Sequence, residues 1–182
     1  GPGYTNTMDY ITIASTGNAT DFGDTTFSGR ALWCAGNNDR GLIGGGVGET
    51  TTDRIEYIDP SSAGNASDFG NMTAASAVSG YQAASTGTNI SRAVYGGGQP
   101  AVDVMGYVTI ATTGNATDFG DMYVARQGHG ACTNDTRMTS AGGNSNIVDI
   151  EYITVATTGD AADFGDLTVG RWYTAATSGT AS

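Results

Sequence analysis

Residues 107–121 read Tyr-Val-Thr-Ile-Ala-Thr-Thr-Gly-Asn-Ala-Thr-Asp-Phe-Gly-Asp, and this stretch organises the whole chain. Close variants of it occupy residues 10–24, 57–71 and 152–166. The tyrosine-to-phenylalanine distance is 12 residues in every copy, whereas the phenylalanines are 47, 50 and 45 residues apart. Each copy is therefore the rigid part of a repeated unit, and the length variation belongs to loops between copies. We expect the four phenylalanines to be buried and equivalent: Phe22, Phe69, Phe119 and Phe164.

The composition predicts an all-β protein. The chain has 182 residues, of which 29 are glycine, three are leucine and none is lysine. No window carries a sustained helical stripe, and Val, Ile, Thr and Tyr mark the apolar segments, as in strands. The length suits one domain with its own core, so we treat residues 1–182 as a single domain.

The charge and the cysteines exclude several classes of function. The formal net charge is −11, which argues against nucleic acid and anionic membranes because both need a basic surface. No apolar run is long enough to cross a membrane, and no signal peptide is recognisable. Gly1-Pro2 resembles a protease-cleavage scar. Cys34 and Cys132 match no metal spacing and lie in non-adjacent repeats, so we expect no disulfide between them.

Each unit reads as four short strands. In the third repeat the expected strands are residues 128–133, 137–141, 150–156 and 166–169, with a turn over the Asp-Phe-Gly-Asp segment. Four antiparallel strands in a unit of 45–50 residues are typical of a β-propeller blade. Glycine clusters follow the second strands, and six of the seven arginines recur in repeat phase: Arg30, Arg40, Arg92, Arg126, Arg137 and Arg171.

The third repeat resembles a Kelch repeat. The residues that carry the resemblance are Arg126-Gln127-Gly128-His129-Gly130, Arg137, Gly142-Gly143, Glu151-Tyr152 and Phe164. Phe stands where that family has Trp, and a single repeat keeps the His. The family implies a β-propeller, here of four four-stranded blades of about 47 residues. The wording of the repeat also resembles repeats in tail-fibre and other virion proteins of marine bacteriophages, which implies a virion or extracellular location and a host-surface glycan or protein as partner.

The last blade is expected to be split between the two ends of the chain. Its first strand would be residues 172–175, and its third and fourth would be residues 9–13 and 24–27, while the second strand is missing. Such closure removes free sheet edges. If one chain cannot bridge the gap, two chains can exchange ends, so we expect closure of the chain on itself or on a second copy.

Two sets of repeated polar residues are candidate sites. Acidic pairs recur three residues apart, at Asp21/Asp24, Asp118/Asp121 and Asp163/Asp166. They could hold Ca²⁺, but turn capping by Asp side chains explains them better, so we expect no required metal or cofactor. The phased arginines could recognise an anionic sugar, although repetition favours a structural bridge between blades.

The positions that break the repeat are better candidates for ligand binding. They are Trp33, Tyr81, His129, Trp172 and Tyr173. Aromatic side chains there could stack on sugar rings at a channel mouth, or they could fill the core between blades.

The leading hypothesis is a non-enzymatic Kelch-like propeller that serves as a binding or structural module of a phage particle. One alternative is a structural or engineered repeat-protein fragment that assembles through its termini. Another is a glycan hydrolase or lyase, which needs two well-placed carboxylates or a nucleophile and a base. The aspartates are spread by the repeat rather than gathered, which favours the non-enzymatic reading.

Overall fold

The computed structural model describes residues 3–46, 52–73, 91–134 and 136–177. Within these ranges the chain forms thirteen β-strands and one 3-10 turn, η2 (Asn144–Asn146), so the all-β prediction is confirmed. Every strand pair is antiparallel. Cys34 and Cys132 are both free, as expected.

The strands form four sheets, which we number in chain order. Sheet 1 contains β1 (Thr7–Tyr10) and β2 (Thr20–Asp24). Sheet 2 contains β3 (Trp33–Gly36), β4 (Gly41–Gly44), β5 (Arg54–Ile58) and β6 (Ser67–Asn71). Sheet 3 contains β7 (Arg92–Gly96), β8 (Val102–Thr109) and β9 (Thr117–Arg126). Sheet 4 contains β10 (Gly130–Thr133), β11 (Arg137–Ala141), β12 (Asp149–Thr154) and β13 (Ala162–Asp166).

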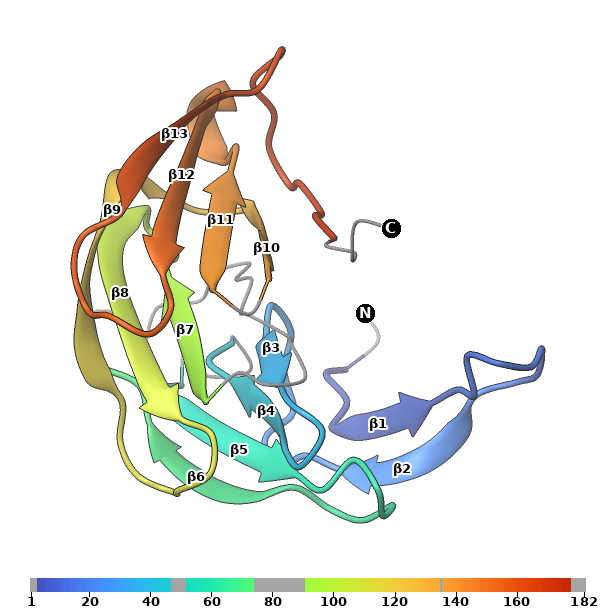
Figure 1. The fold of residues 1–182 in the computed structure, drawn as a ribbon. Helices are drawn as coiled ribbons and strands as arrows, with labels where there is room; N and C mark the ends of the chain where they lie inside the picture. Colours follow the sequence, from blue (N-terminus) through green and yellow to red (C-terminus); the bar gives the residue numbers. More distant parts are fainter. Residues whose placement is uncertain (1–2, 47–51, 74–90, 135, 178–182) are drawn as a thin grey trace.

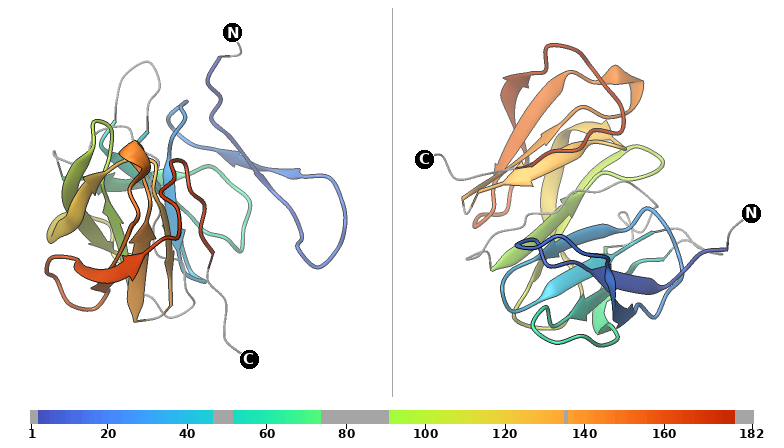
Figure 2. Two further views of the ribbon diagram at one scale, coloured as in Figure 1. Left: turned by 90° about the horizontal axis from the view of Figure 1, so that it is seen from above. Right: turned by 90° about the vertical axis from the view of Figure 1, so that its right-hand side faces the viewer.

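The four sheets follow one another around an open arc (Figure 1). Strands β3, β4, β7, β10 and β11 lie toward its inside, and β6, β9 and β13 form its outer rim. Sheet 1 stands at one end of the arc, and the segment after β13 occupies the other end (Figures 1 and 2). Among the described residues, no strand of sheet 1 pairs with a strand of sheet 4.

The expected split blade is therefore not formed. Residues 172–175 form no strand, and sheet 1 has two strands rather than a share of four. The physical reason is that the C-terminal segment packs on sheet 4 instead: the Thr174 backbone N–H lies 3.4 Å from the Gly128 carbonyl oxygen, and its hydroxyl donates to the Ala141 carbonyl. The innermost strand expected for the second repeat, around Gly80 and Tyr81, lies outside the described residues.

A bulge in each outer strand replaces the turn expected over Asp-Phe-Gly-Asp. In sheet 4, Ile150 pairs with Gly165 and Glu151 pairs with Asp163, which leaves Phe164 as the extra residue. The glycine after each phenylalanine has a φ between 136° and 149°, a conformation that side chains disfavour. The bulge turns each phenylalanine edge-on to the tyrosine of its own copy, with ring centroids 5.8–6.1 Å apart in all four copies.

The four phenylalanines are not equivalently buried, so that prediction is wrong for two of them. Phe69 and Phe119 are 2% exposed, Phe22 is half-buried and Phe164 is 56% exposed. The loop of the following sheet covers Phe22, Phe69 and Phe119, because a glycine N–H of that loop donates to the phenylalanine carbonyl. Phe22 lacks inner strands beneath it, and Phe164 lacks a following sheet.

Candidate functional site

Two of the five candidate aromatic positions belong to the core. Trp33 is 1% exposed, stacks on Tyr95 with ring centroids 5.2 Å apart, and directs its indole N–H at the sulfur of Met72, 3.0 Å away. His129 is buried in the corresponding place of sheet 4. Neither side chain can stack on a sugar ring from there, so the core-filling alternative holds for both. Tyr81 lies outside the described residues.

His129 is held neutral by its surroundings. Burial and the neighbouring positive charge of Arg126 lower its pKa to about 4, and its Nδ1 has no hydrogen-bond partner among the described residues. A buried imidazole that must lose its proton to fold makes stability depend on pH. The unfolded chain binds the proton below about pH 6.5, whereas the folded protein resists it down to about pH 4.

Lowering the pH from 7 to 5 is expected to reduce the free energy of unfolding through His129 by about 2 kcal/mol, because only the unfolded chain gains the proton in that window. Denaturant titrations at both pH values measure this loss. His129→Leu has no proton to bind, so its own change should be smaller by that amount. An equal decrease in both proteins would show that His129 titrates normally.

Trp172 and Tyr173 remain at the surface. They are 45% and 61% exposed, and their rings stack with centroids 4.9 Å apart and an interplanar angle of 7°. Tyr173 has a φ of 54°, in the left-handed region. Gly128, which likewise comes two residues after a phased arginine, has a φ of 64°. A bulky side chain thus stands where sheet 4 uses glycine, at a conformational cost of about 1–2 kcal/mol.

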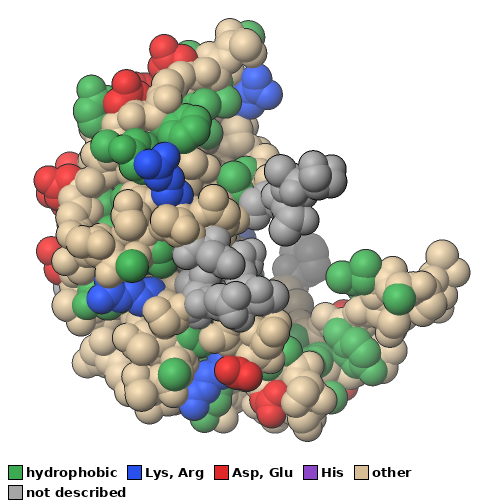
Figure 3. Space-filling view, viewed as in Figure 1, with side chains coloured by type: hydrophobic (Ala, Val, Ile, Leu, Met, Phe, Trp, Pro, Cys, Tyr) green, Lys and Arg blue, Asp and Glu red, His purple; other side chains and the backbone are tan. Residues whose placement is uncertain are grey.

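The arginines of the inner strands serve the architecture. Arg40, Arg92 and Arg137 each place the guanidinium over the tyrosine of their own sheet, 4.5–4.7 Å from the ring centroid. Arg40 also donates to the Ile110 carbonyl of the next sheet, and Arg92 to the Ala156 carbonyl. Figure 3 shows arginine side chains spread singly over the visible face rather than gathered into an anion-binding patch.

The buried ion pair between Arg126 and Glu151 is a feature that the sequence did not reveal. The Arg126 Nη2 donates to Glu151 at 2.9 Å, and Nη1 donates to the carbonyls of Gly142 and Asp149. The Glu151 carboxylate also accepts the backbone N–H of Tyr123. Burial raises the pKa of Glu151, while Arg126 and the backbone donors oppose that rise.

A second buried glutamate, Glu56, occupies the same repeat position in sheet 2. It accepts from the backbone N–H and hydroxyl of Thr26, and lies 3.5 Å from the half-exposed Arg54. The available clue was a glutamate directly before the tyrosine in two of the four copies.

In two of the acidic pairs, the first aspartate bonds the backbone of its own bulge. Asp21 accepts the backbone N–H of Gly23, and Asp163 accepts that of Gly165. Desolvation and the charges of Asp103, Asp160 and Asp118 raise the pKa of Asp121. Within the described parts of the chain, no cluster of three or more His, Cys, Asp or Glu side chains is arranged to hold a metal.

Removal of calcium is expected to leave the melting temperature unchanged, because Asp21 and Asp163 already bond the backbone of their own bulges. Differential scanning calorimetry with and without excess chelator measures it. A decrease of more than a few degrees would instead assign Asp21, Asp24, Asp118, Asp121, Asp163 and Asp166 to calcium sites.

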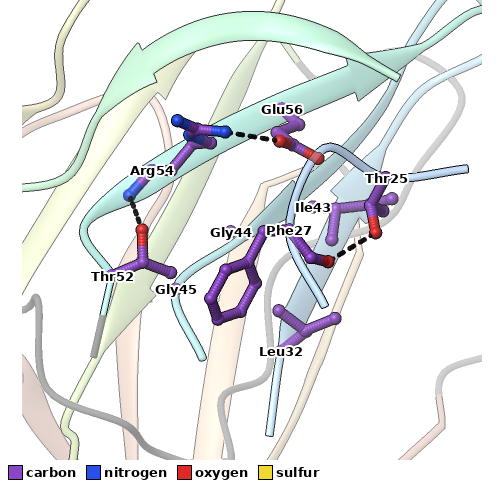
Figure 4. A pocket seen from close by; sticks show the side chains of 9 residues that line it. All are labelled: Thr25, Phe27, Leu32, Ile43, Gly44, Gly45, Thr52, Arg54 and Glu56. Atoms are coloured by element: carbon purple, nitrogen blue, oxygen red, sulfur yellow. Dashed lines mark hydrogen bonds and ion pairs between the residues drawn. The ribbon is translucent and has the colours of Figure 1, made fainter. Parts of the chain in front are cut away.

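The pockets offer little room for a ligand. The one in Figure 4 lies between Phe27, Leu32, Ile43 and the Arg54–Glu56 pair, and holds about 10 Å³, the space of one water at most. A shallow polar pocket of about 160 Å³ lies inside the β8–β9 loop. Its walls include Gly114 and Asn115, which already bond β6.

Comparisons with known proteins establish likeness of fold only. No known family profile and no curated protein matches the sequence. Among solved structures, one titled "Structure of YjhT" superposes with a TM-score of 0.65 and 12% sequence identity. The match covers 88% of this chain and 62% of that chain, so this chain spans less than two thirds of that structure. Among the described residues, no helix has the length and apolar character needed to cross a membrane.

Proposed function

We propose that the chain is a non-enzymatic, Kelch-like β-propeller module that binds a ligand at the surface formed by Trp172 and Tyr173. Four similar antiparallel sheets arranged around an arc support the propeller assignment (Figure 1). The fold-level likeness to a solved structure over 88% of the chain is consistent with it.

The left-handed conformation of Tyr173 is the observation that carries the binding proposal. At the corresponding position of sheet 4, Gly128 adopts the same left-handed conformation without strain. At position 173 the chain instead holds a tyrosine, 61% exposed and stacked on the neighbouring tryptophan. Conformational strain at an exposed side chain is a pointer to function, because folding alone would favour its removal.

A sugar is the ligand chemistry that this pair suits. The two parallel, exposed rings stack on each other and leave flat apolar outer faces on which a sugar ring can stack. The resemblance of the repeat wording to phage tail-fibre and virion proteins supports a host-surface glycan, or a host protein bearing one, and a virion or extracellular location.

Catalysis is less well supported than binding. The two buried glutamates, Glu56 and Glu151, belong to different sheets, and each is already bonded by an arginine and by a backbone N–H. A glycoside hydrolase needs two carboxyl groups facing each other across a substrate.

Binding to a panel of bacterial surface polysaccharides, measured by glycan array and by calorimetry, tests the proposal. We expect a ligand whose affinity falls at least tenfold in Trp172→Ala and in Tyr173→Gly, the latter being the more stable protein because its strain is relieved. Tyr123→Ala, which removes another exposed aromatic ring, is the matched control.

Two results would contradict the proposal. The first is binding to no surface glycan, or binding that survives both substitutions. The second is shortening of the polysaccharide during incubation with the wild-type chain, which would indicate the hydrolase or lyase alternative.

A further inference from the structure

The same set of three hydrogen bonds recurs at every boundary between neighbouring sheets, and it joins an outer strand to the loop of the next sheet. At the boundary of sheets 1 and 2, the Gly64 N–H donates to the Phe22 carbonyl at 2.7 Å, and the Ala66 N–H donates to the Asp24 carbonyl at 2.9 Å. The Asp24 N–H donates to the Asn65 Oδ1 at 3.0 Å.

The next two boundaries repeat this set. Between sheets 2 and 3 it consists of Gly114 to Phe69 (2.8 Å), Ala116 to Asn71 (2.8 Å) and Asn71 to Asn115 (3.0 Å). Between sheets 3 and 4 it consists of Gly159 to Phe119 (2.7 Å), Ala161 to Asp121 (2.8 Å) and Asp121 to Asp160 (3.0 Å). Each set consists of two bonds between backbone groups and one from a backbone N–H to an Asn or Asp side chain. The contact is therefore a property of the repeat.

Glycine makes this contact possible. A Cβ added at Gly23, Gly70 or Gly120 would overlap the backbone of Gly64, Gly114 or Gly159, respectively, in the loop of the following sheet. The same test at Gly165 finds nothing within 4 Å. Gly165 keeps the glycine and the backbone conformation of the contact, with a φ of 139°, but has no loop opposite it.

The two ends of the arc thus carry the two halves of a fourth contact. At one end, the sheet 4 edge at Phe164, Gly165 and Asp166 has no loop of the described residues against it, and Phe164 is 56% exposed where Phe69 and Phe119 are 2% exposed. At the other end, the sheet 1 loop has Gly17, Asn18 and Ala19 in the positions of Gly159, Asp160 and Ala161, and all three are exposed.

An apolar side chain beside the sheet 1 loop is likewise exposed where its counterparts in sheets 3 and 4 are buried. Ile13 corresponds to Ile110 and Val155, which are buried against the preceding sheet at 0% and 5% exposure. Ile13 is 95% exposed. In the preceding sheets, Arg40 and Arg92 donate to carbonyls of the next sheet beside these residues. Arg137 is positioned over Tyr152 in the same way, at the end of the arc.

We propose that sheet 1 of one copy docks on sheet 4 of a second copy through this fourth contact. The Gly17 N–H would donate to the Phe164 carbonyl, the Ala19 N–H to the Asp166 carbonyl, and the Asp166 N–H to the Asn18 side chain. Ile13 would be buried beside Arg137. This docking is independent of the glycan-binding surface formed by Trp172 and Tyr173.

A second copy is the occupant because sheet 1 cannot reach sheet 4 of its own chain in this arc. The two lie at opposite ends of the arc (Figures 1 and 2). The match covers 62% of the similar solved chain, so that chain has residues without a counterpart in this arc. The contact is head-to-tail, and such interfaces build rings when they close and filaments when they do not.

Sedimentation velocity on the 182-residue chain over a range of concentrations tests the docking. Wild-type protein is expected to assemble beyond the monomer. Ile13→Asp damages only the sheet 1 half, and Phe164→Asp damages only the sheet 4 half, so each alone should weaken association at least tenfold. Asn18→Ala should weaken it in the same direction. Tyr123→Asp, at an exposed site in sheet 3, is the matched control and should assemble as wild type does.

Mixing the two damaged proteins is the sharpest test. Ile13→Asp retains an intact sheet 4 edge and Phe164→Asp retains an intact sheet 1 loop, so the mixture should form a one-to-one dimer and nothing larger. Circular dichroism of each variant confirms that it is folded. The proposal is overturned if wild type stays monomeric at all concentrations, if the damaged proteins alone associate as strongly as wild type, or if the mixture stays monomeric.

Discussion

Replacing Arg126 with Met is expected to reduce the free energy of unfolding by about 3–5 kcal/mol. Arg126 is fully buried, and its guanidinium bonds the Glu151 carboxylate and the carbonyls of Gly142 and Asp149. Its removal leaves the charge of Glu151 in the core with only backbone donors. Urea titration of the purified variant at pH 7 measures the loss.

Two comparisons isolate the buried charge as the cause. The double variant Arg126→Met/Glu151→Leu removes both charges and should recover at least half of the loss. Arg54→Met breaks the corresponding pair with Glu56, but Arg54 is half-exposed, so that change should be about 1 kcal/mol or less. Equal losses at Arg54 and Arg126 would refute the assignment of the large effect to burial.

Replacing Phe119 with Ala is expected to destabilise the protein by about 3–5 kcal/mol, because it opens a cavity in the core and removes the edge-on contact with Tyr107. The same substitution at Phe164 removes an exposed ring and should cost about 1 kcal/mol or less in dilute monomer. Thermal or urea unfolding of both variants at low concentration gives the comparison. Similar losses at the two positions would mean that Phe164 is covered in the isolated chain.

The repeat predicted the fold class and most strand positions because its period and alternation are local properties. Strand β11 was placed correctly at Arg137–Ala141. The outer strands were placed too late, since the bulge at each Asp-Phe-Gly segment looks like a turn in sequence. The sequence also treats the four copies as equal, whereas burial depends on whether another sheet follows, which explains Phe164.

For a similar reason, the sequence could not show which of the candidate site residues are buried and which are exposed. Trp33, His129 and Tyr173 all interrupt the repeat, and interruption alone does not separate a side chain that fills the core from one that faces solvent. What separates them is the backbone conformation at Tyr173 and the sheet that covers Trp33, and both are tertiary properties. The buried pair of Arg126 and Glu151 needs a contact across 25 residues, which no local pattern contains.

Hydrogen exchange of individual backbone amides, followed by NMR at increasing protein concentration, tests whether one repeated contact joins neighbouring sheets within a chain and joins sheet 4 of one copy to sheet 1 of another. We predict that Gly64, Gly114 and Gly159 are protected at every concentration, since each donates across a boundary within the chain. The amides of Gly17 and Asp166 should exchange freely in dilute solution and become protected together as the concentration rises. Free exchange of Gly17 and Asp166 at all concentrations, or fast exchange at the three internal glycines, would contradict it.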